Sequence, residues 1–194
     1  MKLAITGNIG CGKSTFSGFA EEKGFIVLKA DDISKEILEN DDKVRELVIR
    51  NFGSDSYLNN KPNKKYLAEK IFSDQTKKEK LESILHPLVI KKIERKMKEL
   101  QKTSKHVFVE AALIYESDLE AMFDYVILIT AEIELRKKRK IASGLTETDF
   151  NLREVNQIPE EEKKKRADFT FSNNGSTGEL KSKFNLLLIT LGIN

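Results

Sequence analysis

Five short runs in this chain have the length and apolar character of buried strands. They are Leu3–Ile5, Phe25–Leu28, His106–Glu110, Tyr125–Thr130 and Phe169–Ser172. Tyr125–Thr130 is the clearest, because it is continuous, apolar and β-branched, as a central parallel strand requires. The segments between these runs carry apolar residues at helical spacing. This alternation predicts an α/β fold with a parallel five-stranded sheet flanked by helices.

The region from residue 32 to residue 105 has a different pattern, with no convincing strand. Leu81–Leu85 has helical spacing, and Pro87 is expected to begin a further helix, since proline is favoured in a first helical turn. The polar stretch Ser54–Asn63 is typical of a loop. We therefore predict a lysine-rich, all-helical insertion between the second and third strands.

A glycine-rich segment follows the first strand and matches the phosphate-binding pattern G-x-x-x-x-G-K-[ST]. The segment reads Gly7, Asn8, Ile9, Gly10, Cys11, Gly12, Lys13 and Ser14, followed by Thr15. A strand, a glycine-rich loop and a helix in this order direct backbone N–H groups and a helix dipole at one point. The pattern predicts a nucleoside triphosphate site at this phosphate loop (residues 7–15); a chance glycine-rich turn is the alternative.

Three side chains near this loop have the chemistry for phosphoryl transfer. Lys13 is expected to reach the β- and γ-phosphates of ATP, and the Ser14 hydroxyl to bind Mg²⁺. Glu110 ends the third strand and is expected to hold a water molecule on that Mg²⁺, although a solvated strand end is the alternative. Cys11 lies at a helix N-terminus, a setting that favours the thiolate, but phosphoryl transfer gives it no nucleophilic role.

Asp31 follows the second strand and is the candidate for a catalytic base. Ligands of an open parallel sheet bind outside the carboxyl ends of its strands, so Asp31 is expected near the phosphate loop. Its carboxylate would accept the proton of an attacking hydroxyl. Alternatively, Asp31 caps the helix predicted from about Ile33 onward, a role that Asp32 could fill equally well.

A basic cluster follows the fourth strand. Helical spacing places Arg136, Arg139 and Lys140 on one side, from which they could close over phosphates as part of a lid. Exposed runs of Lys and Arg are common, so a solvated face is the alternative. We expect Arg136 to contact ATP and Arg139 to take part in catalysis, while the pattern leaves open which arginine reaches the γ-phosphate.

Composition and net charge limit the class of protein, its location and its partners. Hydrophobic residues make up 39% and charged residues 34% of the 194 residues, as in an ordinary globular protein. The formal net charge of +3 is too small to indicate a nucleic-acid partner, although it suits phosphorylated ligands. A single cysteine excludes an intrachain disulfide. No apolar run approaches the roughly 20 residues of a membrane span, and no signal peptide is visible. We expect a cytoplasmic protein without a membrane or nucleic-acid partner, and a monomer is favoured.

The motifs discriminate between classes of nucleotide-binding protein. Asn60-Lys61-Pro62-Asn63 lacks the carboxylate with which GTPases read guanine, and Glu110 followed by alanine is only a partial match to a motor-type ATPase. A small-molecule kinase needs an acceptor-binding insertion, a carboxylate near the acceptor and a basic lid, and this chain has a candidate for each. A nucleoside or nucleotide kinase and, less favoured, a nucleotide-gated regulatory ATPase stay open as alternatives.

Motifs from end to end of the chain resemble those of the dephospho-CoA kinase family. They are Ile5–Thr15, Ala30-Asp31-Asp32-Ile33, Phe52-Gly53, His86-Pro87, Leu113-Ile114-Tyr115-Glu116, Asp124-Tyr125-Val126, Gln157 with Pro159, and Ala167-Asp168 with Asn173. The phosphate loop alone is shared by many kinases, whereas this ordered set is much more specific.

The resemblance implies a P-loop kinase fold and transfer of the γ-phosphoryl group of ATP to the ribose 3′-hydroxyl of dephospho-CoA, the last step of coenzyme A synthesis. It implies a nucleotide-binding core of residues 1–31 and 106–194, an insertion at 32–105 that binds dephospho-CoA, and a lid at 131–166. Asp31 would be the base on the acceptor side, and Asn173 would lie near the adenine of ATP.

The chain departs from the family pattern at Ala112, which stands in place of a proline, in a shorter lid around Ile141-Ala142-Ser143, and at three residues with candidate roles. Lys29 stands in place of an aspartate, so Asp31 is left to act without that second carboxylate. Glu110 replaces an aspartate, and its longer side chain would still reach a metal-bound water. Lys64 replaces an arginine and cannot repeat a bidentate grip on phosphate.

Overall fold

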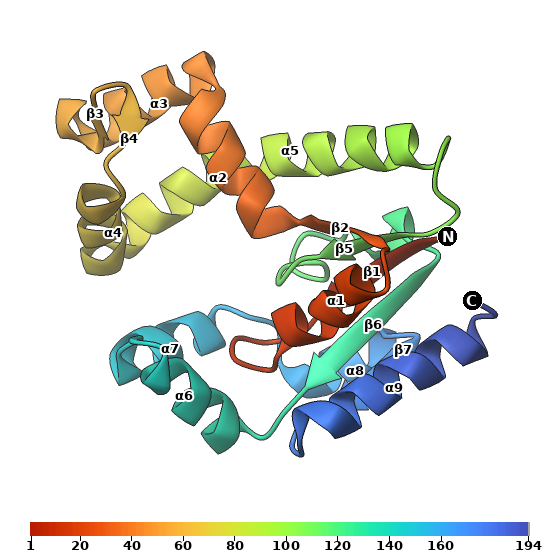
Figure 1. Cartoon of the computed structure of the whole chain (residues 1–194). Coiled ribbons are helices and arrows are strands. Elements are labelled where there is room, and N and C mark those ends of the chain that lie inside the picture. The colour runs from red at the N-terminus through yellow and green to blue at the C-terminus, as the bar shows by residue number, and fades with distance from the viewer. Residues whose placement is uncertain (194) are drawn as a thin grey trace. The chain divides into compact units, whose positions relative to one another are not determined.

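The computed structural model describes residues 1–193, except for the side chains of Phe72 and Ser73. The predicted core ends at Asn194, which lies outside the described residues. The chain forms two compact units (Figure 1). The sheet unit contains residues 1–28 and the chain from Leu100 onward, and the helical unit contains Lys29–Glu99.

All five predicted strands are present and form one sheet, in the order β2-β5-β1-β6-β7. Their bounds are Lys2–Thr6 for β1, Ile26–Lys29 for β2, Val107–Glu110 for β5, Tyr125–Thr130 for β6 and Phe169–Ser172 for β7. The central strand β1 pairs in parallel with β5 and β6. Ile5, two residues before the phosphate loop, lies opposite Glu110 on β5 and Ile127 on β6. The sheet therefore brings Glu110 level with the start of the phosphate loop.

One face of this sheet packs against two helices, α1 (Lys13–Glu22) and α9 (Thr177–Thr190). Phe16 of α1 is fully buried, and its ring meets that of Phe184 edge-on at 5.2 Å between centroids. Burial of a phenylalanine stabilises a fold by about 2–3 kcal/mol. Because Phe16 lies in the first turns of α1, this packing also fixes the helix end that follows the phosphate loop.

The rest of the sheet unit contains three helices between β6 and β7. They are α6 (Ile133–Ala142), α7 (Glu147–Val155) and α8 (Glu160–Arg166), and a short 3₁₀ turn, η2 (Glu120–Met122), precedes β6. Thr146 caps α7, since its side chain accepts the Asp149 N–H at 3.1 Å. The predicted lid segment 131–166 thus consists of three helices.

The helical unit has its own apolar core. Its elements are α2 (Ala30–Asn40), α3 (Asp42–Phe52), η1 (Ser54–Ser56), α4 (Lys64–Ser73) and α5 (Gln75–Leu100). Helices α2, α3 and α5 each bury a stripe of apolar residues, as amphipathic helices do, for example Val44 and Val48 of α3. Within residues 1–193, no helix is long and apolar enough to cross a bilayer.

The prediction of an entirely helical insertion is wrong at one place. Tyr57–Leu58 (β3) and Lys61–Pro62 (β4) form a small antiparallel hairpin. Asn59 and Asn60 turn the chain with φ angles of 50° and 63°. Asparagine is among the few non-glycine residues that tolerate this left-handed region, which is what a two-residue hairpin turn requires. The two strands are too short to show an alternating pattern in the sequence.

The prediction that Pro87 begins a helix is also wrong, since Pro87 lies inside the continuous helix α5. Proline removes one backbone hydrogen bond and crowds the preceding turn, so it disfavours such a position. Buried residues on both sides of Pro87, at Leu85, Val89, Ile93 and Met97, lie along one face of α5. Tertiary packing of this long stripe outweighs the local cost of the proline.

Candidate active site

The phosphate loop approaches neighbouring backbone so closely that side chains are excluded. Gly7 has a φ of 147°, and a Cβ there would lie 2.1 Å from the Ile129 carbonyl oxygen of β6. Gly10 has a φ of 79°, and its Cβ would lie 2.6 Å from the Arg136 carbonyl oxygen of α6. Glycine is the residue that meets both demands. The loop is therefore a bare backbone turn that leads into the N-terminus of α1, an arrangement that favours anions.

Lys13 is the first residue of α1, and its side chain folds back over the loop. Its Nζ donates to the Gly7 carbonyl at 2.8 Å and to the Asn8 carbonyl at 3.3 Å. These contacts hold the ammonium group above the loop's backbone. Its expected contact with the β- and γ-phosphates stays a prediction.

Ser14 and Glu110, both expected at a Mg²⁺ site, lie together. The Ser14 hydroxyl donates to Glu110 Oε1 at 2.6 Å. Ser17, one turn later on α1, donates to Glu110 Oε2 at 2.7 Å and is fully buried. Sequence reasoning missed Ser17, although its spacing of three from Ser14 on a helix places both hydroxyls on one side.

The donor set at this place fits Mg²⁺. Hydroxyl and carboxylate oxygens are the ligands that Mg²⁺ takes in proteins, usually together with waters and substrate phosphates. Within residues 1–193, no group of three or more His, Cys, Asp or Glu side chains could hold a metal by itself. A cation that arrives with a nucleotide needs only one or two protein oxygens, and Ser14 and Glu110 offer them.

Asn173 supports the loop from the other side. It is buried, its Nδ2 donates to the Cys11 carbonyl at 2.8 Å, and its own N–H donates to the Thr130 carbonyl at 2.7 Å. Cys11 is fully buried, and this burial raises the pKa of its thiol despite the nearby charge of Lys13. The expectation that the helix N-terminus favours the Cys11 thiolate is therefore wrong, because desolvation outweighs it.

The two candidate arginines of α6 have different surroundings. Arg136 is only 4% exposed and forms a bidentate pair with Glu154 of α7, at 2.5 and 2.7 Å. Its Nε donates to the Ala131 carbonyl at 2.9 Å, and its Nη1 lies 3.2 Å from the Ile9 carbonyl of the phosphate loop. The guanidinium of Arg136 is thus occupied by protein groups.

Arg139 is less fully engaged. Its Nη2 donates to the Asn173 carbonyl at 2.8 Å, while its Nη1 is buried and has no hydrogen-bond partner among the described residues. A buried donor without a partner costs free energy, so it is satisfied most readily by an arriving acceptor such as a phosphate oxygen. Of the two arginines, this geometry favours Arg139 for contact with a triphosphate.

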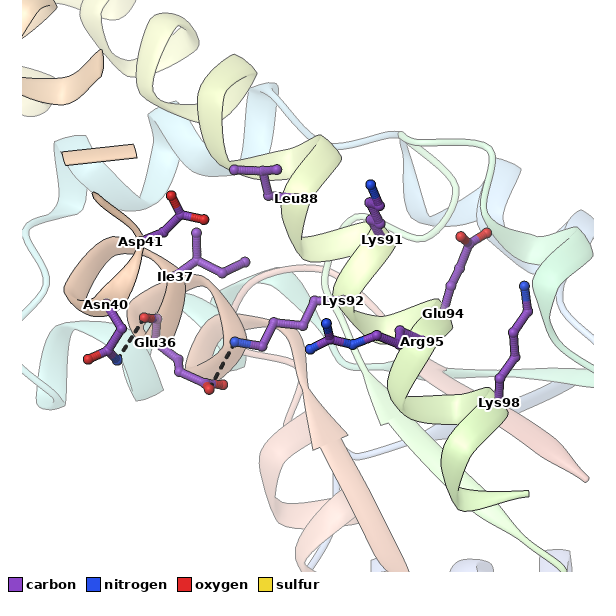
Figure 2. Close-up of a pocket in the computed structure, with 10 residues that line it drawn as sticks. All are labelled: Glu36, Ile37, Asn40, Asp41, Leu88, Lys91, Lys92, Glu94, Arg95 and Lys98. Atoms are coloured by element: carbon purple, nitrogen blue, oxygen red, sulfur yellow. Dashed lines mark hydrogen bonds and ion pairs between the residues drawn. The ribbon is translucent and has the colours of Figure 1, made fainter. Parts of the chain in front are cut away.

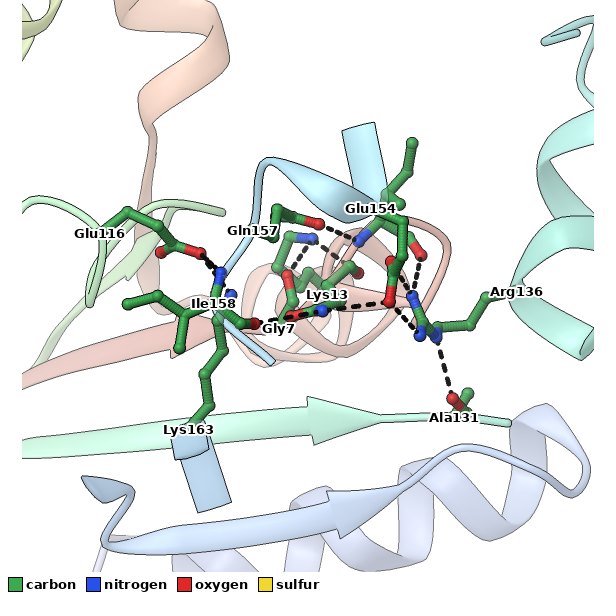
Figure 3. A network of polar contacts seen from close by, with 11 residues as sticks. Gly7, Lys13, Glu116, Ala131, Arg136, Glu154, Gln157, Ile158 and Lys163 are labelled. Carbon is green, nitrogen blue, oxygen red and sulfur yellow. Dashed lines mark hydrogen bonds and ion pairs between the residues drawn. The ribbon is translucent and has the colours of Figure 1, made fainter. Parts of the chain in front are cut away.

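A group that sequence reasoning missed lies where the segment 131–166 returns to the phosphate loop. The Ile9 N–H donates to Gln157 Oε1 at 2.8 Å, and the Ile158 N–H donates to Glu116 Oε1 at 3.0 Å. The Nζ of Lys163 lies 2.7 Å from the same Glu116 oxygen (Figure 3). Lys163 stands in the charge run Glu160–Arg166, so its burial had no visible signal in the sequence.

Asp31 belongs to the helical unit and lies in the first turn of α2. This helix begins at Ala30, three residues earlier than expected, with Lys29 at the N-cap and no side-chain cap. The alternative that Asp31 or Asp32 caps the helix is therefore wrong. Asp32 instead pairs with Lys35 at 2.9 Å, and this hydrogen bond lowers the pKa of the Asp32 carboxyl. The catalytic role of Asp31 stays a prediction.

The helical unit also contains a cavity of about 530 Å³ between α2 and α5. Figure 2 shows its lining: Glu36, Ile37, Asn40 and Asp41, with Leu88, Lys91, Lys92, Glu94, Arg95 and Lys98. Lys92 is paired with Glu36 at 2.9 Å, so part of its basic lining is already neutralised. Lys64, one of the departures noted above, pairs with Glu39 at 3.0 Å.

Comparison with known proteins places this geometry among kinases. A family model described as dephospho-CoA kinase matches residues 1–179. The dephospho-CoA kinase of Aquifex aeolicus is 37% identical over 180 residues, which cover 92% of this chain and 91% of the relative. Among solved structures, TT1252 of Thermus thermophilus is 33% identical with a TM-score of 0.79, covering 98% of this chain and 97% of the other. The dephospho-CoA kinase of Campylobacter jejuni is 32% identical with a TM-score of 0.73, covering 98% of each chain.

Proposed function

The chain belongs to the dephospho-CoA kinase family, and on this premise we propose how its residues carry out the reaction. The protein is an ATP-dependent kinase with a P-loop kinase fold that phosphorylates dephospho-CoA in coenzyme A synthesis. The observation that carries the proposal is the meeting of Lys13, Ser14 and Glu110 at one loop. The atom phosphorylated is the ribose 3′-hydroxyl oxygen, as the family resemblance implies.

The phosphate loop receives the triphosphate of ATP. Backbone N–H groups at the start of α1 and the ammonium of Lys13 neutralise the negative charge that phosphoryl transfer redistributes. To do so, Lys13 exchanges its contacts with the Gly7 and Asn8 carbonyls for phosphate oxygens. Arg139 adds a further positive charge through its Nη1, which has no partner among the described residues. Arg136 keeps the loop in place through its contact with the Ile9 carbonyl.

Ser14 and Glu110 are the residues that would hold Mg²⁺, which when bound would neutralise negative charge on the nucleotide phosphates. The Ser14 hydroxyl would bind the ion, and Glu110 would hold one of its water molecules. Ser17 keeps the Glu110 carboxylate turned toward Ser14, because it donates a hydrogen bond to the second carboxylate oxygen.

Asp31 is the base on the acceptor side, and residues 32–105 bind dephospho-CoA. Asp31 is exposed and has no side-chain capping bond, so its carboxylate is available to accept a proton from a sugar hydroxyl. The cavity residues Glu36, Ile37 and Asn40 lie on the other side of α2 from Asp31, as the helical repeat requires. The acceptor hydroxyl therefore meets α2 on a side that the cavity does not use.

The remaining proposals concern whole segments and the setting of the protein. Segment 131–166 acts as the lid of the nucleotide site within a core of residues 1–31 and 106–194. The protein works as a cytoplasmic monomer, which suits its single, buried cysteine and its small-molecule substrates.

Transfer assays with a panel of acceptors test this function. Purified protein with ATP and Mg²⁺ is offered dephospho-CoA, nucleosides and nucleotides, and products are identified by mass spectrometry and ³¹P NMR. The expected product carries one added phosphate on the 3′-oxygen of dephospho-CoA. Transfer to nucleosides with none to dephospho-CoA would overturn the assignment in favour of a nucleoside kinase. ATP hydrolysis indifferent to every acceptor would indicate a regulatory ATPase.

A further inference from the structure

Lys163 is a charged residue in the interior of the sheet unit. It lies in the middle of α8, whose sequence EEEKKKR reads as a solvated charge run, yet its side chain is 0% exposed. Its neighbour Lys164 keeps 36% exposure and pairs with Glu160 and Glu161 at the surface. Lysine is almost never fully buried unless it has a partner or a task. In the proposed reaction, Lys163 neither binds a phosphate nor transfers a proton.

Its partner is Glu116, in the segment after β5. The Lys163 Nζ lies 2.7 Å from Glu116 Oε1, and this carboxylate is only 14% exposed. Burial lowers the pKa of Lys163, and the charge of Lys13 lowers it further, while the bond to Glu116 opposes both. The ammonium group of Lys163 therefore stays charged only with Glu116 beside it, since an unpaired buried charge is strongly disfavoured.

The same oxygen of Glu116 holds a second group, the Ile158 N–H, at 3.0 Å. Residues 157 and 158 in turn touch residues 8–9 of the phosphate loop. Gln157 Oε1 accepts the Ile9 N–H at 2.8 Å, and the Asn8 amide lies 3.5 Å from the Ile158 carbonyl. Polar contacts thus lead from Lys163 through Glu116 to Ile158 (Figure 3). From residues 157–158 they continue to residues 8–9.

We propose that Lys163 and Glu116 are positioning residues for nucleotide binding, which hold Gln157 and Ile158 against the phosphate loop so that residues 8–9 keep the conformation that receives the phosphates. The inference rests on the proposed function only in taking this loop as the ATP site. Neither residue touches the reacting atoms. A pair that merely stabilised α8 would affect the stability of the fold without a specific effect on ATP.

The test removes both charges together, because removal of one would leave the other buried and unpaired. In the double variant Lys163→Met/Glu116→Gln, the glutamine keeps an oxygen for the Ile158 N–H. We expect a folded protein in which Kd for ATP rises about tenfold, since small misplacement of binding groups has effects of this size or larger. KM for dephospho-CoA should change less than twofold. Lys164→Met, one position along the same helix, should match the wild type in all three respects.

A double-mutant cycle with Gln157→Ala distinguishes an effect on the position of the phosphate loop from an effect on the stability of the fold. If Lys163 and Glu116 act through Gln157, its removal should raise Kd for ATP in the wild-type background but have little further effect in the double variant. Independent, additive effects on Kd would overturn the inference, as would a folded double variant with unchanged Kd and kcat. Because ATP binding is measured directly by calorimetry, this result stands even if the wild type proves not to phosphorylate dephospho-CoA.

Discussion

The sheet unit and the helical unit present their candidate chemistry in different ways. In the sheet unit, Lys13, Ser14, Glu110 and Asn173 are each held by at least one hydrogen bond within 3 Å, and the loop between them tolerates no side chain at Gly7 or Gly10. In the helical unit, Asp31 is exposed at the start of a helix, and the cavity between α2 and α5 has an already paired lysine in its lining.

This difference follows from what each substrate demands. Phosphoryl transfer depends on positioning and on charge neutralisation around a phosphate, so the groups that do this must be fixed in advance. An acceptor hydroxyl needs one accessible carboxylate to take its proton. The comparison teaches that damage to the sheet unit should affect ATP, while damage at Asp31 should affect transfer alone.

The largest effect is expected from Lys13→Ala. Loss of the ammonium above the phosphate loop should lower kcat roughly a thousandfold, the size seen when one stabilising donor of a transition state is removed. Initial-rate kinetics with dephospho-CoA would measure it, with the exposed Lys23→Ala at the end of α1 as control. A near-normal rate would contradict the role of the phosphate loop.

Asp31→Asn should come next, with kcat lowered on the order of a hundredfold because a general base is lost. Kd for ATP should stay unchanged, because Asp31 belongs to the helical unit and the phosphate loop to the sheet unit. Asp32→Asn removes the neighbouring exposed carboxylate and should leave turnover near normal. Equal turnover in Asp31→Asn and the wild type would show that Asp31 is not the base.

The two arginines of α6 should separate into two kinds of effect. Arg139→Met should lower kcat by about tenfold to a hundredfold, through loss of a donor to the phosphates. Arg136→Met should instead lower the free energy of unfolding by about 3 kcal/mol, because the half-buried carboxylate of Glu154 is left without its charged partner. Urea denaturation and initial-rate kinetics on both variants test these two effects. A stability loss confined to Arg139→Met and a kcat loss confined to Arg136→Met would contradict the assignment. The exposed Lys138→Met provides the control.

The smallest expected effect concerns pH. Burial alone would raise the pKa of Glu154, but the hydrogen bonds and charge of Arg136 outweigh it and lower this pKa. Its contribution to stability is thus complete above the ordinary glutamate pKa and is lost as pH falls through the lowered value. Glu154→Gln should therefore flatten the loss of unfolding free energy as the pH falls below the ordinary glutamate pKa. An unchanged pH profile would contradict this, and the exposed Glu161→Gln should keep the wild-type profile.

The sequence predicted more of the sheet unit than of the helical unit. Each strand is a contiguous apolar run, and the phosphate loop is a contiguous motif, so both are visible in one stretch of residues. The proximity of Ser14 and Glu110 could be predicted from the sequence because parallel strands end at one edge of the sheet. By contrast, the strands of the hairpin at Tyr57–Pro62 are too short to show an alternating pattern. The passage of α5 through Pro87 depends on tertiary packing, which outweighs the local signal of the proline.

The burial of single charged residues could not be predicted for a related reason. Lys163 looks like its neighbours in a charge run, and Arg136 like the other basic residues of α6. What distinguishes them is a carboxylate distant in sequence: Glu116 for Lys163, and Glu154 for Arg136. Such pairings depend on the fold itself, so pattern and composition carry no trace of them.

Amide hydrogen exchange with each substrate in turn tests the division of labour between the units most directly. A non-hydrolysable ATP analogue with Mg²⁺ should slow exchange in residues 7–15, because loop and helix-start amides become hydrogen-bonded to phosphates. Dephospho-CoA alone should slow exchange within Lys29–Glu99. Protection of residues 7–15 by both ligands, with none in Lys29–Glu99, would contradict the account.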